Sequence, residues 1–346
     1  MCSDVLYEDF EYLYTMNVDW QKLNNKTVLV TGGTGFIGSL LLKYMNFLNK
    51  EKKFLISLIT VIRNEEKAKE VLNGLNVEIV KADLADKFEI TGQIDYIFHC
   101  AAVTKSKEMI EHPVEVTESI VDATRNVLKL AITNKTESIV YLSSMEVYGQ
   151  PDISDNPVTE DVMGYINPLN SRSCYPLGKR MAENLCYGYY KEYQVPVKIA
   201  RLAQVFGAGI LKEENRVFAQ FAKSAIHGED IVLHTDGSSV GNYCYTIDAL
   251  FGLFLLLLNG ENGEAYNISN ELNNMSIKQM AQLVAAQIAD NKIRVVFDIP
   301  KNNNFGYAPK VNMKLCADKI RLIGWKAKFD MNQMYQRMIR DMLFKE

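Results

Sequence analysis

The feature that most constrains the fold is a run of glycines placed directly after an apolar segment. Val28-Leu29-Val30 leads into Thr31-Gly32-Gly33-Thr34-Gly35-Phe36-Ile37-Gly38, and a helical pattern follows over Ile37–Leu48. Glycines at this spacing allow a tight turn and let the backbone approach a pyrophosphate, whose charge is stabilised at the N-terminus of the next helix. The pattern therefore predicts a strand, a glycine-rich turn and a helix that together bind a dinucleotide.

Composition excludes several classes of protein. The chain has 346 residues, 48% of them hydrophobic, which is enough to bury the core of a soluble globular protein. A net charge of -4 gives no basic surface for nucleic acid. The longest apolar stretch, Ala249–Leu258, is far shorter than the ~20 residues of a membrane span and predicts a buried helix. We therefore expect neither a nucleic-acid nor a membrane partner.

Cysteine usage and the N-terminal residues indicate the compartment. The first residues, MCSDVLYEDFEYLY, lack the basic start and apolar core of a signal peptide. The six cysteines lack C-x-x-C spacing and a nearby histidine cluster, so they predict neither a disulfide framework nor a zinc site. We expect reduced thiols and a cytoplasmic location.

Short apolar runs alternate with helical patterns. The expected strands are apolar almost throughout, as is typical of strands covered on both faces, and the alternation predicts an α/β fold with a doubly wound parallel sheet. The expected strands are Thr27–Thr31, Leu55–Ile62, Val77–Val80, Tyr96–Cys100, Ser138–Leu142 and Val197–Leu202. The longer helices are expected over Ile37–Leu48, Val114–Thr133 and Pro176–Tyr193. We expect an N-terminal helical extension over 1–24, a dinucleotide-binding domain over 25–202 plus about 243–265, and a smaller C-terminal lobe over 203–242 and 266–346.

The ends of the expected strands supply candidate cofactor contacts. The second strand ends in Ile62-Arg63-Asn64, without the acidic residue that accepts hydrogen bonds from the adenosine ribose. Arg63 can pair with a 2′-phosphate, which favours NADP(H) over NAD(H), although Glu65 and Glu66 can occupy it instead. Asp83-Leu84 and the small residues Ala101 and Ala102 follow the third and fourth strands. An aspartate after a strand is also a common helix cap.

A second group of residues suggests proton transfer. Ser143-Ser144 ends the fifth strand, and Tyr175 and Lys179 are spaced to share one face of a helix. A phenol is a poor base at neutral pH, but a neighbouring ammonium and a cationic nicotinamide ring favour the phenolate. Ser144 can then hold the reacting oxygen. The Y-x-x-x-K pattern alone is equally typical of a surface helix.

These motifs together resemble the extended short-chain dehydrogenase/reductase family, in its NAD-dependent epimerase/dehydratase branch. The resemblance rests on TGGTGFIG, Asp83-Leu84, HCAA, SSMEVYG, YPLGK and RLAQVFG, and it spans roughly residues 25 to 340. It implies a Rossmann-type domain with a smaller C-terminal substrate-binding lobe, a bound nicotinamide cofactor, a nucleotide-sugar substrate and a homodimer formed through two helices. It also implies that Tyr175 is the base, that Lys179 is its activator and that Ser144 is the third member of the triad.

The resemblance extends to further site residues, and it implies no metal. The implied cofactor-binding residues are Gly32, Thr34, Gly35, Phe36, Ile37, Gly38, Arg63, Asp83, Leu84, Ala101, Ala102, Tyr175 and Lys179. The implied substrate-binding residues are Thr104, Ser144, Met145, Gln204 and Arg216. The expected reaction begins with oxidation of the sugar C4 hydroxyl and continues with dehydration or decarboxylation, in the synthesis of cell-surface glycans.

Four positions decide between reactions of this kind. Glu146 stands where family members that dehydrate or decarboxylate carry a glutamate, and it is a candidate acid or base, although it can instead bind backbone amides or a lysine. Met145, Gln204 and Gly241 depart from the family pattern; at Gly241 a phosphate-binding arginine is usual, and Arg216 or Lys223 can replace it or form plain surface charge. The alternatives are a C4-epimerase, an NADP(H)-dependent ketoreductase and a dinucleotide-sensing protein without activity.

Overall fold

The expected apolar runs form the central sheet. The computed structural model describes residues 3–300 and 310–345. Seven strands pair in parallel, and their order reverses between β1 and β4, which is where sheets of this kind bind ligands. The order is β10 (Ala265–Ile268), β6 (Val197–Leu202), β5 (Ser138–Ser144), β4 (Tyr96–His99), β1 (Thr27–Thr31), β2 (Ser57–Ile62) and β3 (Glu78–Lys81). The predicted α/β class with a Rossmann-type parallel sheet is confirmed.

One strand departs from the expectation that every strand is covered on both faces. β3 lies at the edge of the sheet, and Glu78, Ile79 and Lys81 are exposed. The expectation was wrong here because an edge strand pairs on one side only, so its side chains need not be apolar. The strand begins and ends one residue later than predicted.

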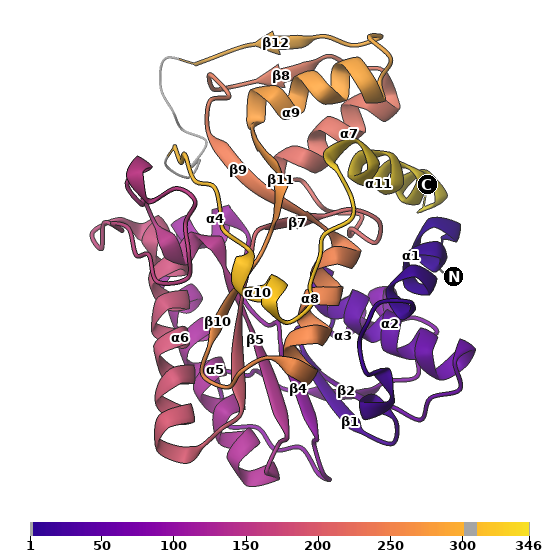
Figure 1. Cartoon of the computed structure of the whole chain (residues 1–346), viewed down its shortest axis with the longest axis vertical. Coiled ribbons are helices and arrows are strands. Elements are labelled where there is room, and N and C mark those ends of the chain that lie inside the picture. The colour runs from indigo at the N-terminus through magenta and orange to yellow at the C-terminus, as the bar shows by residue number, and fades with distance from the viewer. Residues whose placement is uncertain (1–2, 301–309, 346) are drawn as a thin grey trace.

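Helices cover both faces of the sheet (Figure 1). α2 (Phe36–Glu51), α3 (Glu65–Val71) and α8 (Thr246–Asn259) pack on one face, and α5 (Pro113–Asn134) and α6 (Cys174–Tyr193) pack on the other. α8 contains the predicted buried helix, because its apolar residues face the sheet on one side and the C-terminal segments on the other. No helix in the described ranges is long and apolar enough to cross a membrane.

A smaller group of elements lies beyond the carboxyl ends of the strands, in the upper part of Figure 1. β7 (Gln204–Phe206), β9 (Val240–Tyr245) and β11 (Asn270–Ser276) form a three-stranded sheet, and β8 (Ile231–Leu233) pairs with β12 (Val295–Phe297). Apart from the N-terminal helix, the α-helices not yet named are α4 (Ser106–Glu111), α7 (Val217–His227), α9 (Ile277–Leu283), α10 (Asp318–Leu322) and α11 (Met331–Lys345).

The N-terminal helix α1 (Asp4–Tyr14) joins the two parts of the molecule. It packs against α8 and α11, with Leu6, Phe10 and Leu13 buried. The Tyr245 hydroxyl donates to Asp9 Oδ2 at 2.5 Å, and Arg337 of α11 contacts Asp9 Oδ1 at 2.7 Å. Cys2 lies outside the described residues, and the division of the chain into domains stays a prediction.

Candidate active site

The glycine turn after β1 has the shape that a pyrophosphate needs. Gly32 adopts a φ of +68°, and a Cβ there would lie 2.9 Å from the backbone of Ala101. A Cβ on Gly38 would lie 2.3 Å from the Gly32 carbonyl oxygen, so only glycine lets α2 start this close to the turn. Gly35 caps α2 without a side-chain acceptor, which leaves the first N–H groups of the helix available to an anion.

The ends of β1 and β4 are joined below this turn by a buried hydrogen-bonded chain. The Thr124 hydroxyl donates to the Ile120 carbonyl at 2.7 Å and so accepts from His99 Nε2 at 3.1 Å. His99 Nδ1 then accepts from the Thr31 hydroxyl at 2.8 Å, and the Thr31 oxygen accepts from the N–H of Ala101 at 3.2 Å. Burial lowers the pKa of His99 to about 3, so the imidazole is neutral and serves as a connector.

The expected adenosine contacts lie together at the ends of β2 and β3. Arg63 Nη1 lies 3.5 Å from Asp83 Oδ2, and both side chains are largely exposed. Asp83 Oδ1 accepts from the N–H of Ala85 at 3.0 Å in a turn that follows β3, and no helix begins at these described residues for it to cap. Asn126 Nδ2 donates to three successive carbonyls that begin at Leu84, and thereby fixes this loop against α5.

The residues of this edge therefore fit a dinucleotide. The glycine turn and the N-terminus of α2 suit the pyrophosphate, Arg63 and Asp83 lie where the adenosine end is expected, and Ala101 and Ala102 leave room over the end of β4. Thr34, Phe36 and Ile37 are half-buried around the same turn.

Three residues of the expected triad converge beyond β5. Ser144 is the last residue of β5, and α6 begins at Cys174, so Tyr175 and Lys179 lie in its first turns. The Ser144 side chain lies near enough to the Tyr175 phenol to lower its pKa. Lys179 Nζ lies 5.9 Å from the centre of the Tyr175 ring and donates to the Leu142 carbonyl at 2.6 Å. The end of β5 and the start of α6 therefore bring these three side chains close together.

Burial dominates the ionisation of this group. It raises the pKa of Tyr175 well above its usual value, and the negative charge of Glu146 raises it further, while Ser144, Arg172 and Arg216 lower it. Burial also lowers the pKa of Lys179 to about 8. In the protein alone the phenol is protonated at neutral pH, so further positive charge is needed before Tyr175 can act as a base.

Glu146 lies in the turn that follows β5, where its carboxylate meets an arginine. Its two oxygens lie 3.0 and 2.9 Å from Arg172 Nη2. Sequence reasoning missed Arg172 because it belongs to no spacing motif. The available signal was its position three residues before Tyr175, which puts it in the turn that leads into the same helix.

A buried ion pair below the triad holds β5, β6 and α6 together. The Ser143 hydroxyl donates to Glu183 Oε1 at 2.5 Å, and Arg201 Nη2 donates to Glu183 Oε2 at 2.7 Å. Arg201 Nη1 also donates to the Tyr148 hydroxyl at 3.1 Å. Sequence reasoning missed Glu183, although Tyr175, Lys179 and Glu183 repeat at the four-residue spacing of one helix face.

The expected substrate-binding residues are less closely grouped. Arg216 precedes α7 and pairs with Glu214 at 2.6 Å, yet its charge still acts on Tyr175. Gln204 begins β7, opposite Tyr243 of β9. Met145 packs on the core beside Glu146, and Thr104 is exposed in the loop after β4. At Gly241 a Cβ would lie 2.9 Å from the Tyr243 hydroxyl, so this tyrosine limits the space for a side chain.

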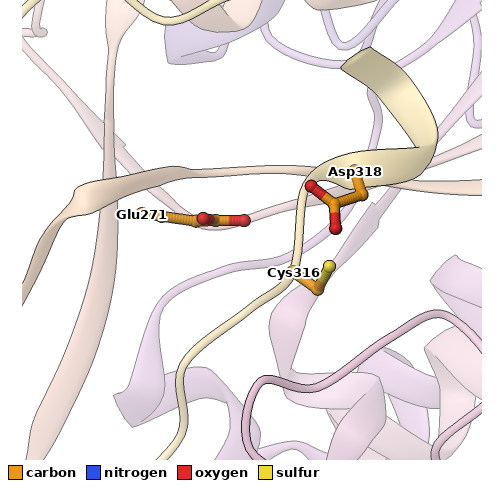
Figure 2. Close-up of side chains that lie close together, drawn as sticks. All are labelled: Glu271, Cys316 and Asp318. Carbon is orange, nitrogen blue, oxygen red and sulfur yellow. The ribbon is translucent and has the colours of Figure 1, made fainter. Parts of the chain in front are cut away.

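One cluster of possible metal ligands occurs among the described residues, away from these groups (Figure 2). Glu271, Cys316 and Asp318 place their ligand atoms within 4.8 Å of one another. Arg321 lies 3.1 Å from Glu271 Oε2 and 2.6 Å from Asp318 Oδ1. Because a guanidinium already pairs with both carboxylates and burial raises the pKa of the Cys316 thiol, this cluster stabilises the start of α10.

Comparisons with known proteins agree with this picture. Residues 28–269 match the model of the NAD dependent epimerase/dehydratase family. UDP-glucuronic acid decarboxylase 6 of Arabidopsis thaliana is 28% identical over 320 residues, which cover 92% of this chain and 89% of that protein. UDP-glucuronic acid decarboxylase 1 of Danio rerio is 29% identical over 271 residues, 77% of this chain, but the match spans only 62% of the fish protein.

Solved structures show the same fold. UDP-glucose 4-epimerase from Thermotoga maritima, solved with UDP-glucose, superposes with a TM-score of 0.77 at 21% identity and covers 92% of this chain and 99% of its own. UDP-glucuronic acid 4-epimerase from Bacillus cereus, solved with UDP-glucuronic acid and NAD, superposes with a TM-score of 0.74 at 18% identity, over 92% of this chain and all (100%) of its own.

Proposed function

Because this chain belongs to the NAD-dependent epimerase/dehydratase family, we propose that it decarboxylates a nucleotide-linked uronic acid, with UDP-glucuronic acid as the first candidate. The observation that carries the proposal is the meeting of Ser144 and Tyr175 with the Glu146–Arg172 pair beside them. The names of the relatives support the choice of a uronic acid.

In this proposal each side chain has one task. Tyr175 accepts the proton of the sugar C4 hydroxyl, and Ser144, whose side chain lies near the phenol, hydrogen-bonds the same sugar oxygen and orients it. A nicotinamide cofactor held by the glycine turn and α2 would supply the hydride acceptor for C4. Lys179, fixed by the Leu142 carbonyl, adds positive charge below the phenol. A ketone at C4 accepts the electrons of the bond to the departing carboxylate, which leaves as carbon dioxide. Glu146 is the proposed acid that protonates C5. The hydride then returns to C4, and Tyr175 returns the proton to the C4 oxygen, so that the cofactor and the base end as they began.

The proposal predicts the mass of the product. Purified protein given UDP-glucuronic acid is expected to release carbon dioxide, and Glu146→Gln is expected to lower that rate by roughly 10²–10⁴-fold, the range for loss of a proton-transfer group. Glu229→Gln, at an exposed position, is the matched control. Mass spectrometry of the products with UDP-, dTDP-, GDP- and CDP-sugars provides the measurement. Loss of water would identify a dehydratase, whereas an unchanged mass with every sugar would exclude both reactions and leave an epimerase or a ketoreductase.

We further propose that the cofactor is NADP(H), through Arg63. The Arg63 side chain is 62% exposed, and its ion pair within the described part of the chain is a 3.5 Å contact with Asp83, so we infer that it is available to a 2′-phosphate. Arg63→Ala is expected to weaken NADP(H) binding about tenfold or more, the size of a charge-assisted hydrogen bond, and to leave NAD(H) binding unchanged. Calorimetric titration of both dinucleotides tests this. Equal losses for the two would assign Arg63 to the adenine or to the loop. A homodimer and a cytoplasmic location stay predictions.

A further inference from the structure

Arg172 is the charged group of the site that the motifs left unassigned. We propose that Arg172 is a positioning residue, which holds Glu146 beside the Tyr175 phenol and offsets the negative charge that Glu146 places there. This inference rests on the proposed role of Tyr175 as the base. The Glu146 carboxylate is needed near the sugar, but its negative charge opposes ionisation of the Tyr175 phenol. Arg172 keeps the carboxylate in place and offsets that charge, so the two residues act as a pair.

The loop before α6 fixes the backbone of Arg172. Asn170 Oδ1 accepts from the Arg172 N–H at 2.9 Å, and Asn167 Oδ1 accepts from the Leu169 N–H at 3.0 Å. The Ser173 hydroxyl donates to the Asn167 carbonyl at 2.6 Å. Asparagine side chains that bind the backbone two residues on hold a turn without help from regular structure. Arg172 is therefore delivered to the start of α6 in one orientation.

The Arg172 guanidinium contacts Glu146 in a geometry that leaves one of its own nitrogens without a hydrogen bond. Both carboxylate oxygens meet the single nitrogen Nη2, and the Arg172 side chain is 14% exposed. Within residues 3–300 and 310–345, its buried Nε has no hydrogen-bond partner. A buried donor without an acceptor loses its hydrogen bonds to water and gains none in return, so a purely structural ion pair would be more stable as a fork that uses two guanidinium nitrogens. The arrangement is typical of a side chain placed for function.

The charges around the phenol come from four elements. Glu146 stands in the turn after β5, Arg172 in the turn before α6, and Arg216 at the start of α7, where Glu214 already pairs with it. Lys179 of α6 contributes from below, with its Nζ 4.7 Å from the ring centre of Tyr141 on β5. Arg172 Cζ lies 6.0 Å from the centre of the Tyr175 ring. Burial apart, Glu146 raises the pKa of Tyr175, and Arg172 and Arg216 lower it.

The signs of these effects define the test. Removing Arg172 alone should raise the pKa of Tyr175, removing Glu146 alone should lower it, and removing both should return it close to the parent value. A charge at this distance changes a pKa by about one pH unit. If the pair only stabilised the fold, both single substitutions would disturb the site alike. The pKa of Tyr175 would then not rise in one single variant and fall in the other.

The experiment titrates the phenol itself. A fluorinated tyrosine is placed at position 175 and followed by ¹⁹F NMR against pH in the protein saturated with NADP⁺, in the parent, Glu146→Gln, Arg172→Met and the double variant. We expect the phenol of Arg172→Met to titrate about one pH unit higher than the parent, that of Glu146→Gln lower, and that of the double variant close to the parent. Arg172→Met that titrates with or below the parent overturns the proposal.

Two controls separate charge from folding. Arg172→Lys keeps the charge and is expected to titrate close to the parent, and if Arg172→Met does not fold, this variant together with Glu146→Gln decides the question. The proposal is also overturned if the Tyr175 phenol titrates about one pH unit above the parent in Arg172→Lys and at the parent value in Glu146→Gln. Arg125→Met, which breaks an exposed pair with Asp122 on α5, is expected to leave the titration unchanged.

The titration needs no sugar, so it is independent of the proposed reaction. If the parent protein fails to decarboxylate any uronic acid but the order of the four titrations holds, the decarboxylase proposal fails and the role of Arg172 stands. If decarboxylation occurs and the order does not hold, the role of Arg172 fails alone. Where turnover is found, Arg172→Met should lower kcat more than it changes KM and should move the pH optimum upward.

Discussion

Tyr175→Phe is expected to lower turnover of the proposed sugar substrate by roughly 10²–10⁴-fold, because in the proposed mechanism it removes the group that accepts the C4 proton. The substitution deletes one oxygen and keeps the ring, which is 7% exposed and packs with α5 and β5 residues in the second core cluster. Binding of the nucleotide and the dinucleotide should change little, so the loss is expected in kcat. Steady-state kinetics with UDP-glucuronic acid provide the measurement.

The matched control lies on the same helix. Tyr187→Phe deletes the equivalent oxygen from a 46% exposed tyrosine of α6 and is expected to leave turnover unchanged. A Tyr175→Phe variant that keeps more than about a tenth of the parent rate would remove Tyr175 from the role of base. Ser144 and Glu146 would then be the remaining candidates for proton transfer at this position.

Six of the seven strands of the central sheet were expected from the sequence, most of them as apolar runs covered on both faces. β3 is the exposed exception, and β10 was not among the expected strands. The glycine turn was equally readable, since Gly32 and Gly38 stand where a Cβ would collide with backbone. The smaller lobe was not resolved into elements from the sequence. β7, β8 and β12 have three residues each, too few to show an alternating pattern, and they exist because neighbouring segments pair with them.

Some contacts of the candidate site could not be predicted from the sequence. Tyr175 and Lys179 lie four residues apart on one helix, so their proximity could be predicted from the sequence. The partners of Glu146 and Glu183 depend on tertiary structure: Arg172 reaches Glu146 from 26 residues away, and Arg201 reaches Glu183 from the neighbouring strand β6. Hydrogen bonds of the Asn167 and Asn170 side chains set the first of these contacts, and strand pairing of β5 with β6 sets the second.

Arg201→Met is expected to destabilise the protein by about 3–5 kcal/mol, the cost of leaving the partner of a buried ion pair uncompensated. The Arg201 and Glu183 side chains are 5% and 9% exposed. Burial alone would lower the pKa of Arg201, but the hydrogen bonds and charge of Glu183 hold it above its usual value. The variant therefore leaves the Glu183 carboxylate buried with only the Ser143 hydroxyl as a donor among its contacts on α6, β5 and β6.

Urea unfolding of single and double variants identifies the cause. Glu183→Gln combined with Arg201→Met removes both charges and should be more stable than Arg201→Met alone, because no unpaired charge remains in the interior. Arg294→Met breaks an exposed pair with Asp230 and should cost at most about 1 kcal/mol. A double variant no more stable than Arg201→Met would show that lost packing, and not the unpaired carboxylate, causes the effect. Because Glu183 lies one turn beyond Lys179 and Ser143 adjoins Ser144, we expect Arg201→Met to lower turnover as well, through the positions of both triad residues.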